Sequence, residues 1–285
     1  MMSKEKIAVL VDSGSDIPKE FMEQEHIYMV PILITFSDAT YLDRISISPA
    51  EVYERMETEI PTTATPSGGS INDVFDQIKA DGYTHVIATT ISSGLSGTYN
   101  SIKTFAKLSS LTVEVIDTKN VGIGGGLAGI LASNLIKEGN YFDEVVTKVQ
   151  LAVDRSSVFF YLPTLHYLQV GGRIGRVSGL MGNLLNIKPI ISCDEDGIYY
   201  PIAKARGEKA ALKKLLSLVD DKIGDSLHFD IAVAYGNNEP LAASIFETLK
   251  TKYPNAEHFY FGDASPALGV HAGPGVIGIG VEILD

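Results

Sequence analysis

The sequence has a single cysteine, no tryptophan and a shortage of basic residues. Of its 285 residues, 23 are Lys or Arg and 35 are Asp or Glu, so the formal net charge is −12. A lone Cys193 cannot form an intramolecular disulfide, which argues against a disulfide-stapled secreted scaffold. The shortage of Lys and Arg argues against a broad surface for nucleic acid or anionic membranes, since both need concentrated positive charge.

Long apolar segments are also scarce. Only five apolar residues lie between Lys6 and Asp12, too few for the core of a signal peptide. The longest uncharged stretch, between Lys119 and Lys137, contains polar residues and five glycines, whereas a membrane span needs about 20 predominantly apolar residues. We therefore expect a cytoplasmic protein without a transmembrane segment, and a buried, closely packed helix in this stretch.

Several motifs for catalysis and phosphate binding are missing. There is no G-x-x-x-x-G-K-[ST] phosphate loop and no G-x-S-x-G nucleophile elbow. The six histidines form no H-x-H or H-E-x-x-H pair. Asp12 and Asp16 follow a predicted strand, and we interpret them as helix caps rather than magnesium ligands. We therefore expect no metal, no cofactor and no catalytic residue in this chain.

One glycine motif leaves a dinucleotide oxidoreductase open as an alternative. Residues Gly124 to Gly129 satisfy the G-x-G-x-x-G spacing, and Asp143 follows at about the distance of a ribose-binding acid. That acid belongs at the end of the next strand, but Asp143 lies at a predicted helix start. We interpret the glycines as sites of close packing between a helix and its sheet.

The order of short apolar runs predicts two α/β domains. In residues 1–155, strands are expected at 6–11, 27–36, 85–90 and 112–117 with helices between them, which is typical of a mostly parallel, doubly wound sheet. In residues 156–285, the expected strands include a hairpin turning at 194–197, and helices are expected at 181–187 and 208–222. We place the domain boundary near residue 155.

Three hydroxyl-rich or histidine-containing segments stand out at predicted turns: Thr62 to Ser67, Ser92 to Thr98, and His271 to Gly275. Turns of parallel strands gather at the carboxyl edge of a sheet, where small hydroxyls and helix N-termini bind anions. Such a site holds an anionic head group without transforming it. The alternative is an acyl hydrolase or acyltransferase that uses a serine of the Ser92–Ser96 loop as nucleophile and His271 as base.

At these residues the chain resembles the DegV family of bacterial fatty-acid-binding proteins. The likeness extends over the whole chain and is carried by the following motifs: Val11-Asp-Ser-Gly-Ser-Asp16, Thr63-Ala-Thr-Pro-Ser67, Ser92-Ser-Gly-Leu-Ser-Gly-Thr-Tyr99, Gly172-Arg-Ile174, Asn186-Ile-Lys-Pro189, Lys204-Ala-Arg-Gly207 and His271-Ala-Gly-Pro-Gly275. The resemblance implies two α/β domains with a long-chain fatty acid between them. The acyl chain would occupy an apolar tunnel, and a separate fatty acid kinase would supply ATP and magnesium to phosphorylate the carboxylate for phospholipid metabolism.

The resemblance also implies roles for single residues. Thr63 and a serine of the second motif, Ser93 or Ser96, would bind the carboxylate, and His271 would lie beside it. Arg206, and with it Arg173, would face the kinase or the phosphorylated head group. The sequence departs from the family's usual T-S-Q-P-S at Ala64 and Thr65, which removes two polar groups beside Thr63.

Overall fold

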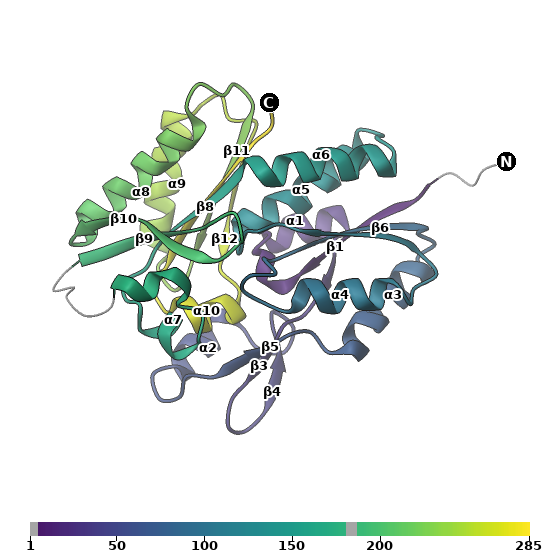
Figure 1. Cartoon of the computed structure of the whole chain (residues 1–285), viewed down its shortest axis with the longest axis horizontal. Coiled ribbons are helices and arrows are strands. Elements are labelled where there is room, and N and C mark those ends of the chain that lie inside the picture. Colours follow the sequence, from purple (N-terminus) through teal and green to yellow (C-terminus); the bar gives the residue numbers. More distant parts are fainter. Residues whose placement is uncertain (1–4, 181–186) are drawn as a thin grey trace.

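The computed structural model describes residues 5–180 and 187–285, which form three β-sheets with helices around them (Figure 1). A four-stranded sheet has the order β2-β1-β6-β7, and a six-stranded sheet has the order β10-β9-β8-β13-β11-β12. A small third sheet, β4-β3-β5, lies between the two large sheets on the lower side of Figure 1.

The first large sheet is entirely parallel and is covered by helices on both faces. Its strands are β1 (Ile7–Asp12), β2 (Tyr28–Val30), β6 (His85–Thr90) and β7 (Thr112–Asp117). One face carries α1 (Lys19–Glu25), α5 (Ile123–Lys137) and α6 (Phe142–Arg155), and the other carries α3 (Gly68–Ala80) and α4 (Thr98–Ala106). Alternate residues of each strand enter the two cores, which explains their continuous apolar runs. The predicted doubly wound parallel sheet is confirmed.

The prediction of one strand over residues 27–36 is wrong. The chain leaves the first sheet after Val30, passes through Pro31 and enters the small sheet as β3 (Leu33–Thr35). Pro31 has no N–H for a β-ladder, and the Ile32 N–H donates to Ser13 Oγ at 2.9 Å instead of to a strand. In the small sheet, β3 pairs antiparallel with β4 (Thr40–Leu42) and β5 (Thr62–Ala64), which the sequence pattern did not reveal.

The second large sheet is mixed and has its own apolar core. Its strands are β8 (Ser156–Tyr161), β9 (Ile187–Cys193), β10 (Tyr199–Arg206), β11 (Phe229–Tyr235), β12 (His258–Asp263) and β13 (Ile277–Ile283). Its helices include α8 (Glu208–Ile223) and α9 (Glu239–Lys252), both packed into that core. The hairpin expected at 194–197 is confirmed by the antiparallel pairing of β9 with β10.

Five shorter helices complete the described chain: α2 (Pro49–Arg55), α7 (His166–Val170), α10 (Pro266–Ala272) and the 3₁₀ helices η1 (Ser13–Ser15) and η2 (Gly175–Leu180). Of the helix predicted at 181–187, residues 181–186 lie outside the described residues, and Ile187 begins β9. Helix α6 ends at Arg155 and β8 begins at Ser156, so the chain passes from one large sheet to the other where we place the domain boundary. The boundary itself stays a prediction.

Helix α5 packs against both large sheets, and its glycines make this possible. A Cβ on Gly126 would lie 2.1 Å from the Ser15 carbonyl oxygen, and one on Gly124 would lie 2.5 Å from Val158 Cβ. On β13 of the second large sheet, which packs against α5, a Cβ on Gly280 would lie 3.1 Å from Gly124 Cα. Asp143 lies in the first turn of α6 rather than at a strand end. The glycine motif therefore serves packing, as expected.

Within residues 5–180 and 187–285, none of the helices has the length and apolar character that crossing a membrane requires.

Helix α5 provides a test of this packing. Replacing Gly126 with Ala should lower the free energy of unfolding by about 2–3 kcal/mol, because the new methyl group collides with a backbone carbonyl that cannot rotate away. Gly69→Ala in α3 is the matched control: its Cβ would find only Ser67 Oγ at 3.8 Å, and Ala favours a helix over Gly. Urea unfolding of both variants measures the difference, and equal effects would contradict the packing role of Gly126.

Candidate functional site

The loops that follow β1 and β6 are tied together by one buried carboxylate. Asp12 caps the 3₁₀ turn Ser13–Ser15 by accepting from the Gly14 N–H at 2.9 Å, as expected, and also accepts from the Ile91 N–H at 2.8 Å. Burial raises the pKa of Asp12 to about 7, although the backbone hydrogen bonds act to lower it. The carboxylate thus joins two loops at the carboxyl edge of the first sheet.

Asp16 does not cap a helix N-terminus, which corrects our interpretation of this residue. It accepts from the Ser265 N–H at 2.7 Å and lies 3.4 Å from the Arg44 guanidinium. Ser265 in turn caps α10, since its Oγ accepts from the Leu268 N–H at 3.2 Å. Asp16 therefore fixes the start of α10 against the first sheet.

Helix α10 carries His271 to Thr63. The helix packs on α2, β3 and β5, and Thr63 Oγ1 on β5 lies 2.7 Å from His271 Nε2. The two residues are 208 positions apart in the chain. Two of the three segments singled out in the sequence therefore meet through a direct hydrogen bond.

The imidazole of His271 is neutral at physiological pH. Burial, and secondly the positive charge of Arg173, lower the pKa of His271 to about 4. Its Nδ1 is buried and has no hydrogen-bond partner among the described residues. A Cβ on Gly171 would lie 2.2 Å from this nitrogen, so only a glycine there lets the backbone come so close to the ring.

A cavity of about 50 Å³ connects these groups with the second motif. Its polar lining comes from Thr63, Thr65, Ser96, Arg173 and His271, and much of the remainder is apolar. Thr65 therefore keeps one polar group beside Thr63, so only Ala64 removes one there. A second cavity of about 30 Å³ has mainly apolar walls. Tyr199 and Leu268 line both cavities, so a polar chamber and an apolar chamber lie on either side of these two side chains.

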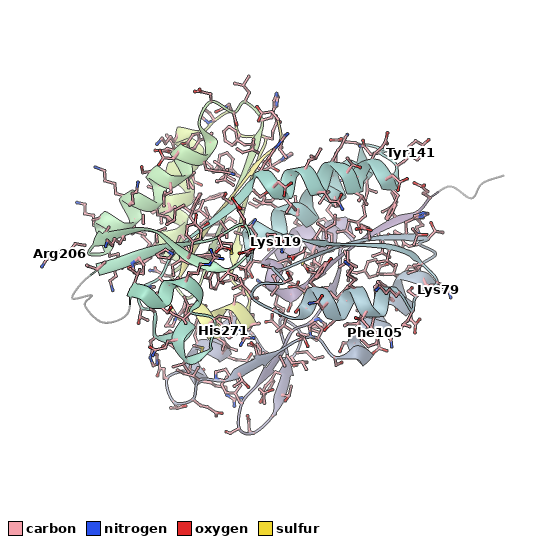
Figure 2. The ribbon with its side chains drawn as sticks, viewed as in Figure 1. Lys79, Phe105, Lys119, Tyr141, Arg206 and His271 are labelled. Atoms are coloured by element: carbon pink, nitrogen blue, oxygen red, sulfur yellow. The ribbon has the colours of Figure 1, made fainter. Side chains whose placement is uncertain are left out.

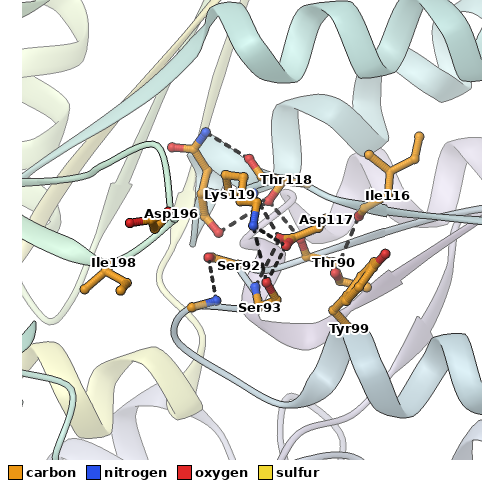
Figure 3. Close-up of polar contacts among 12 residues, drawn as sticks. Thr90, Ser92, Ser93, Tyr99, Ile116, Asp117, Thr118, Lys119, Asp196 and Ile198 are labelled. Atoms are coloured by element: carbon orange, nitrogen blue, oxygen red, sulfur yellow. Dashed lines mark hydrogen bonds and ion pairs between the residues drawn. The ribbon is translucent and has the colours of Figure 1, made fainter.

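The structure separates the two candidate serines. Ser96 lines the polar cavity, and its Oγ lies 2.8 Å from Thr98 Oγ1. The Ser93 hydroxyl instead donates to Asp117 Oδ2 at 2.5 Å (Figure 3), and Ser93 is not part of the cavity lining. The assignment of either serine to a ligand stays a prediction, and the geometry favours Ser96.

The two candidate arginines also lie apart. Arg173 lines the cavity; its Nε donates to the Leu95 carbonyl at 3.4 Å and its Nη1 to the Gly171 carbonyl at 2.9 Å. Arg206 is the exposed last residue of β10 and lies at the edge of the molecule, away from His271 (Figure 2). Its role toward a partner stays a prediction.

Two residues of the site escaped the sequence analysis. Leu268 precedes His271 by three positions on α10, and this spacing places both on one helix face, so the helical pattern contained a usable signal. Tyr199 begins β10 just after the hairpin turn. Its place between the cavities depends on how the hairpin packs, which no local pattern in the sequence encodes.

In the described part of the chain, the serine hydrolase alternative lacks the hydrogen bonds that would activate a serine. It requires a hydrogen bond from a loop serine to His271 and a third group that orients the ring. His271 Nε2 is bonded to Thr63, whereas the hydroxyls of Ser93 and Ser96 are bonded to Asp117 and Thr98. With Nδ1 unpartnered, the ring has no orienting carboxylate, so the geometry favours binding over acyl transfer.

The chain is similar to several known proteins over nearly its whole length. A profile described as "Uncharacterised protein, DegV family" matches residues 6–283. A DegV domain-containing protein of Clostridium acetobutylicum is 39% identical over 276 residues, covering 96% of this chain and 98% of the relative. Among solved structures, a DegV family protein of Thermus thermophilus, described by its fatty acid binding, aligns with a TM-score of 0.91 at 27% identity over 98% of this chain and 100% of the other. A stearic acid-binding protein of Eubacterium ventriosum aligns with a TM-score of 0.89 at 25% identity over 98% and 99% of the two chains.

The electrostatics of the cavity can be tested at Arg173. Replacing Arg173 with Met removes the nearby positive charge while keeping an unbranched stem, so the pKa of His271 should rise. It should stay below its ordinary value, because burial is the larger cause of the shift. NMR titration of the imidazole resonances measures the change. Arg176→Met, whose guanidinium is paired with Asp194 and Asp196, is the control, and an unchanged pKa of His271 in the Arg173 variant would contradict the assignment.

Proposed function

The chain belongs to the DegV family, and from this premise we propose that it binds a long-chain fatty acid and presents it to a separate fatty acid kinase. The observation that supports the proposal best is the cavity lined by Thr63, Ser96, Arg173 and His271, together with a separate apolar chamber that shares Tyr199 and Leu268 with it. One end suits a carboxylate, and the other suits a hydrocarbon chain.

The acyl chain provides most of the affinity in this proposal. Burying about 15 methylenes at roughly 0.8 kcal/mol each contributes about 12 kcal/mol before association and ordering costs. A carboxylate buried without partners would cost several kcal/mol. The polar end of the cavity therefore offsets the cost of burying the carboxylate. It also determines that the carboxylate end of the ligand, rather than the hydrocarbon end, binds there.

Neutral groups do most of the carboxylate binding. With the proton of His271 on Nε2, the ring donates to Thr63 Oγ1, and the Thr63 hydroxyl is then free to donate its own proton to the carboxylate. Ser96 supplies a second hydroxyl, and Arg173 supplies the balancing positive charge. His271 thus acts as a positioning group for Thr63 rather than as a charged partner.

The apolar chamber has to widen to receive a long chain. Cavities of about 50 and 30 Å³ correspond to roughly one or two water molecules, whose share of liquid volume is about 30 Å³ each. Tyr199 and Leu268 line both, so movement of these two side chains joins the chambers. We propose that the ligand enters the apolar chamber by this displacement.

In this proposal the chain is a carrier and not an enzyme. The kinase brings ATP and magnesium, and this protein supplies a carboxylate in a fixed position, in the cytoplasm, for a step of phospholipid metabolism. Arg206 and Lys204 are exposed near the end of β10, so a local basic surface exists despite the net charge of −12. This surface suits an acidic partner or a phosphorylated head group.

Fatty acid binding is tested first on the purified protein. Mass spectrometry of an organic extract should detect a long-chain fatty acid, and delipidated protein should bind oleate. Thr63→Val and Ser96→Ala should each weaken oleate binding about tenfold, because each removes a hydrogen bond to a buried charged group. Thr147→Val on the exposed face of α6 is the control. Protein that neither carries a fatty acid nor binds oleate or palmitate would refute the proposal.

Presentation to the kinase is tested at Arg206. Arg206→Ala should leave oleate affinity unchanged, because the residue lies outside the cavity, and should slow acyl phosphate formation with the ATP-binding kinase several-fold. The assay follows acyl phosphate with time at saturating oleate. Arg155→Ala, at the exposed end of α6, is the matched control, and an unchanged rate in the Arg206 variant would rule out the assigned role.

A further inference from the structure

Asp117 and Lys119 contact Ser93, which lies on the same loop as Ser96 (Figure 3). Asp117, the last residue of β7, accepts from the Ser93 N–H at 3.0 Å through Oδ1 and from the Ser93 hydroxyl at 2.5 Å through Oδ2. Lys119 Nζ lies 2.9 Å from the same Oδ2. The carboxylate at the end of one strand therefore holds the loop after the neighbouring strand, β6.

The hydrogen bonds within this loop extend from Ser93 to the cavity. The Ser92 N–H donates to the Asn120 carbonyl at 2.7 Å. The N–H groups of Leu95 and Ser96 both donate to the Ser92 carbonyl at 3.1 Å. Because the turn is closed in this way, fixing Ser92 and Ser93 also fixes the backbone of Ser96.

The hairpin turn of the second sheet lies directly on the same loop. A Cβ on Gly94 would lie 2.6 Å from the Asp196 carbonyl oxygen, and a Cβ on Gly197 would lie 1.9 Å from Ser92 Oγ. Gly197 also has φ +72°, in the left-handed region. Two glycines thus bring the backbone of the hairpin turn into contact with the loop that contains Ser96.

A loop of this composition needs external anchors. Gly94 and Gly97 flank Leu95 and Ser96, and glycine has the largest backbone freedom to lose on ordering. Burial alone would raise the pKa of Asp117, but the hydrogen bonds from Ser93 and Lys119 outweigh it and lower that pKa. The anchor is therefore an ionised carboxylate over the neutral pH range, and its hydrogen bonds are charge-assisted.

We infer that Asp117 is a positioning residue for head-group recognition: it holds Ser93, and through the closed turn it directs the Ser96 hydroxyl toward the carboxylate of the ligand. The inference rests on the proposed function. It also assigns to Ser93 the anchoring of the loop rather than direct contact with the ligand. Lys119 supports the anchor by pairing with the same carboxylate.

The test compares two ligands that differ only in their head group. Oleate and oleyl alcohol have the same hydrocarbon chain, but oleate carries a carboxylate where oleyl alcohol carries a hydroxyl group. Asp117→Asn keeps the shape of the side chain but replaces one acceptor oxygen with a donor, so the Ser93 hydroxyl and Lys119 lose their partner. Oleate affinity should fall about tenfold, whereas affinity for oleyl alcohol should change little. A general loss of protein stability would lower the affinity for both ligands equally.

A double-mutant cycle tests whether Asp117 affects oleate binding through Ser96. If Asp117 acts through Ser96, Asp117→Asn should weaken oleate binding far less in a Ser96→Ala background than in the wild-type background. Glu114→Gln, on the same strand without a bond to the loop in the described residues, is the control. Ser93→Ala provides a milder second variant, which keeps the backbone hydrogen bond to Asp117 and should shift the oleate-to-alcohol ratio in the same direction.

Each outcome distinguishes the two proposals. Selective loss of oleate affinity, absent in the Ser96→Ala background, supports the inference. Wild-type protein that binds oleate, combined with an Asp117→Asn variant whose oleate-to-alcohol ratio is unchanged, overturns the inference and leaves the proposed function standing. Wild-type protein that binds neither ligand refutes the proposed function, and with it the inference.

Discussion

The backbone contact between α5 and the turn after β1 is the constraint on which the rest of this structure depends. The helix lies against both large sheets, and Gly126 lets it approach the Ser15 carbonyl while Gly124 meets Val158 and Gly280. Any side chain at these positions would push the sheets apart. The candidate site combines the loop after β6 of the first sheet, β5 of the small sheet, and α10, which lies between β12 and β13 of the second sheet. The spacing of these elements therefore determines whether Thr63, Ser96 and His271 can line one cavity.

The site relies on orientation more than on charge. His271 is neutral and partly buried, near Arg173, and the hydroxyls of Thr63 and Ser96 are effective only when they point into the cavity. The need to orient these hydroxyls explains why several neighbouring carboxylates hydrogen-bond to the loops and helix around the site. Asp12 ties two loops of the first sheet together, Asp16 fixes the start of α10, and Asp117 anchors the loop after β6. These three carboxylates organise donors for an anionic head group without contacting it in the proposed arrangement.

Much of the fold and part of the site could be predicted from the sequence. Buried parallel strands appear as continuous apolar runs, so the first sheet and the helix at 123–137 were found. The small sheet was missed because its three-residue strands are too short for a periodic pattern, and Pro31 interrupts an apolar run that otherwise predicts one strand. The segments with Thr63, Ser96 and His271 were singled out as hydroxyl and imidazole groups at predicted turns, and the resemblance to the family selected the individual residues. The prediction of turns is wrong for two of them, since Thr63 lies on β5 and His271 on α10. Choosing Ser96 over Ser93 required knowing that Asp117 lies beside Ser93, which only the pairing of β6 with β7 determines.

The separation of 208 positions between Thr63 and His271 also determines when the pocket forms during synthesis. The strands of the first sheet and the loop with Ser96 leave the ribosome well before α10 does. Contacts between such distant segments carry the largest loop-closure entropy and form late in folding. A nascent chain therefore passes through a stage in which Thr63 and Ser96 are present without their imidazole. The proposed ligand would meet a complete pocket only after α10 has docked, so it would stabilise the finished fold rather than guide its assembly.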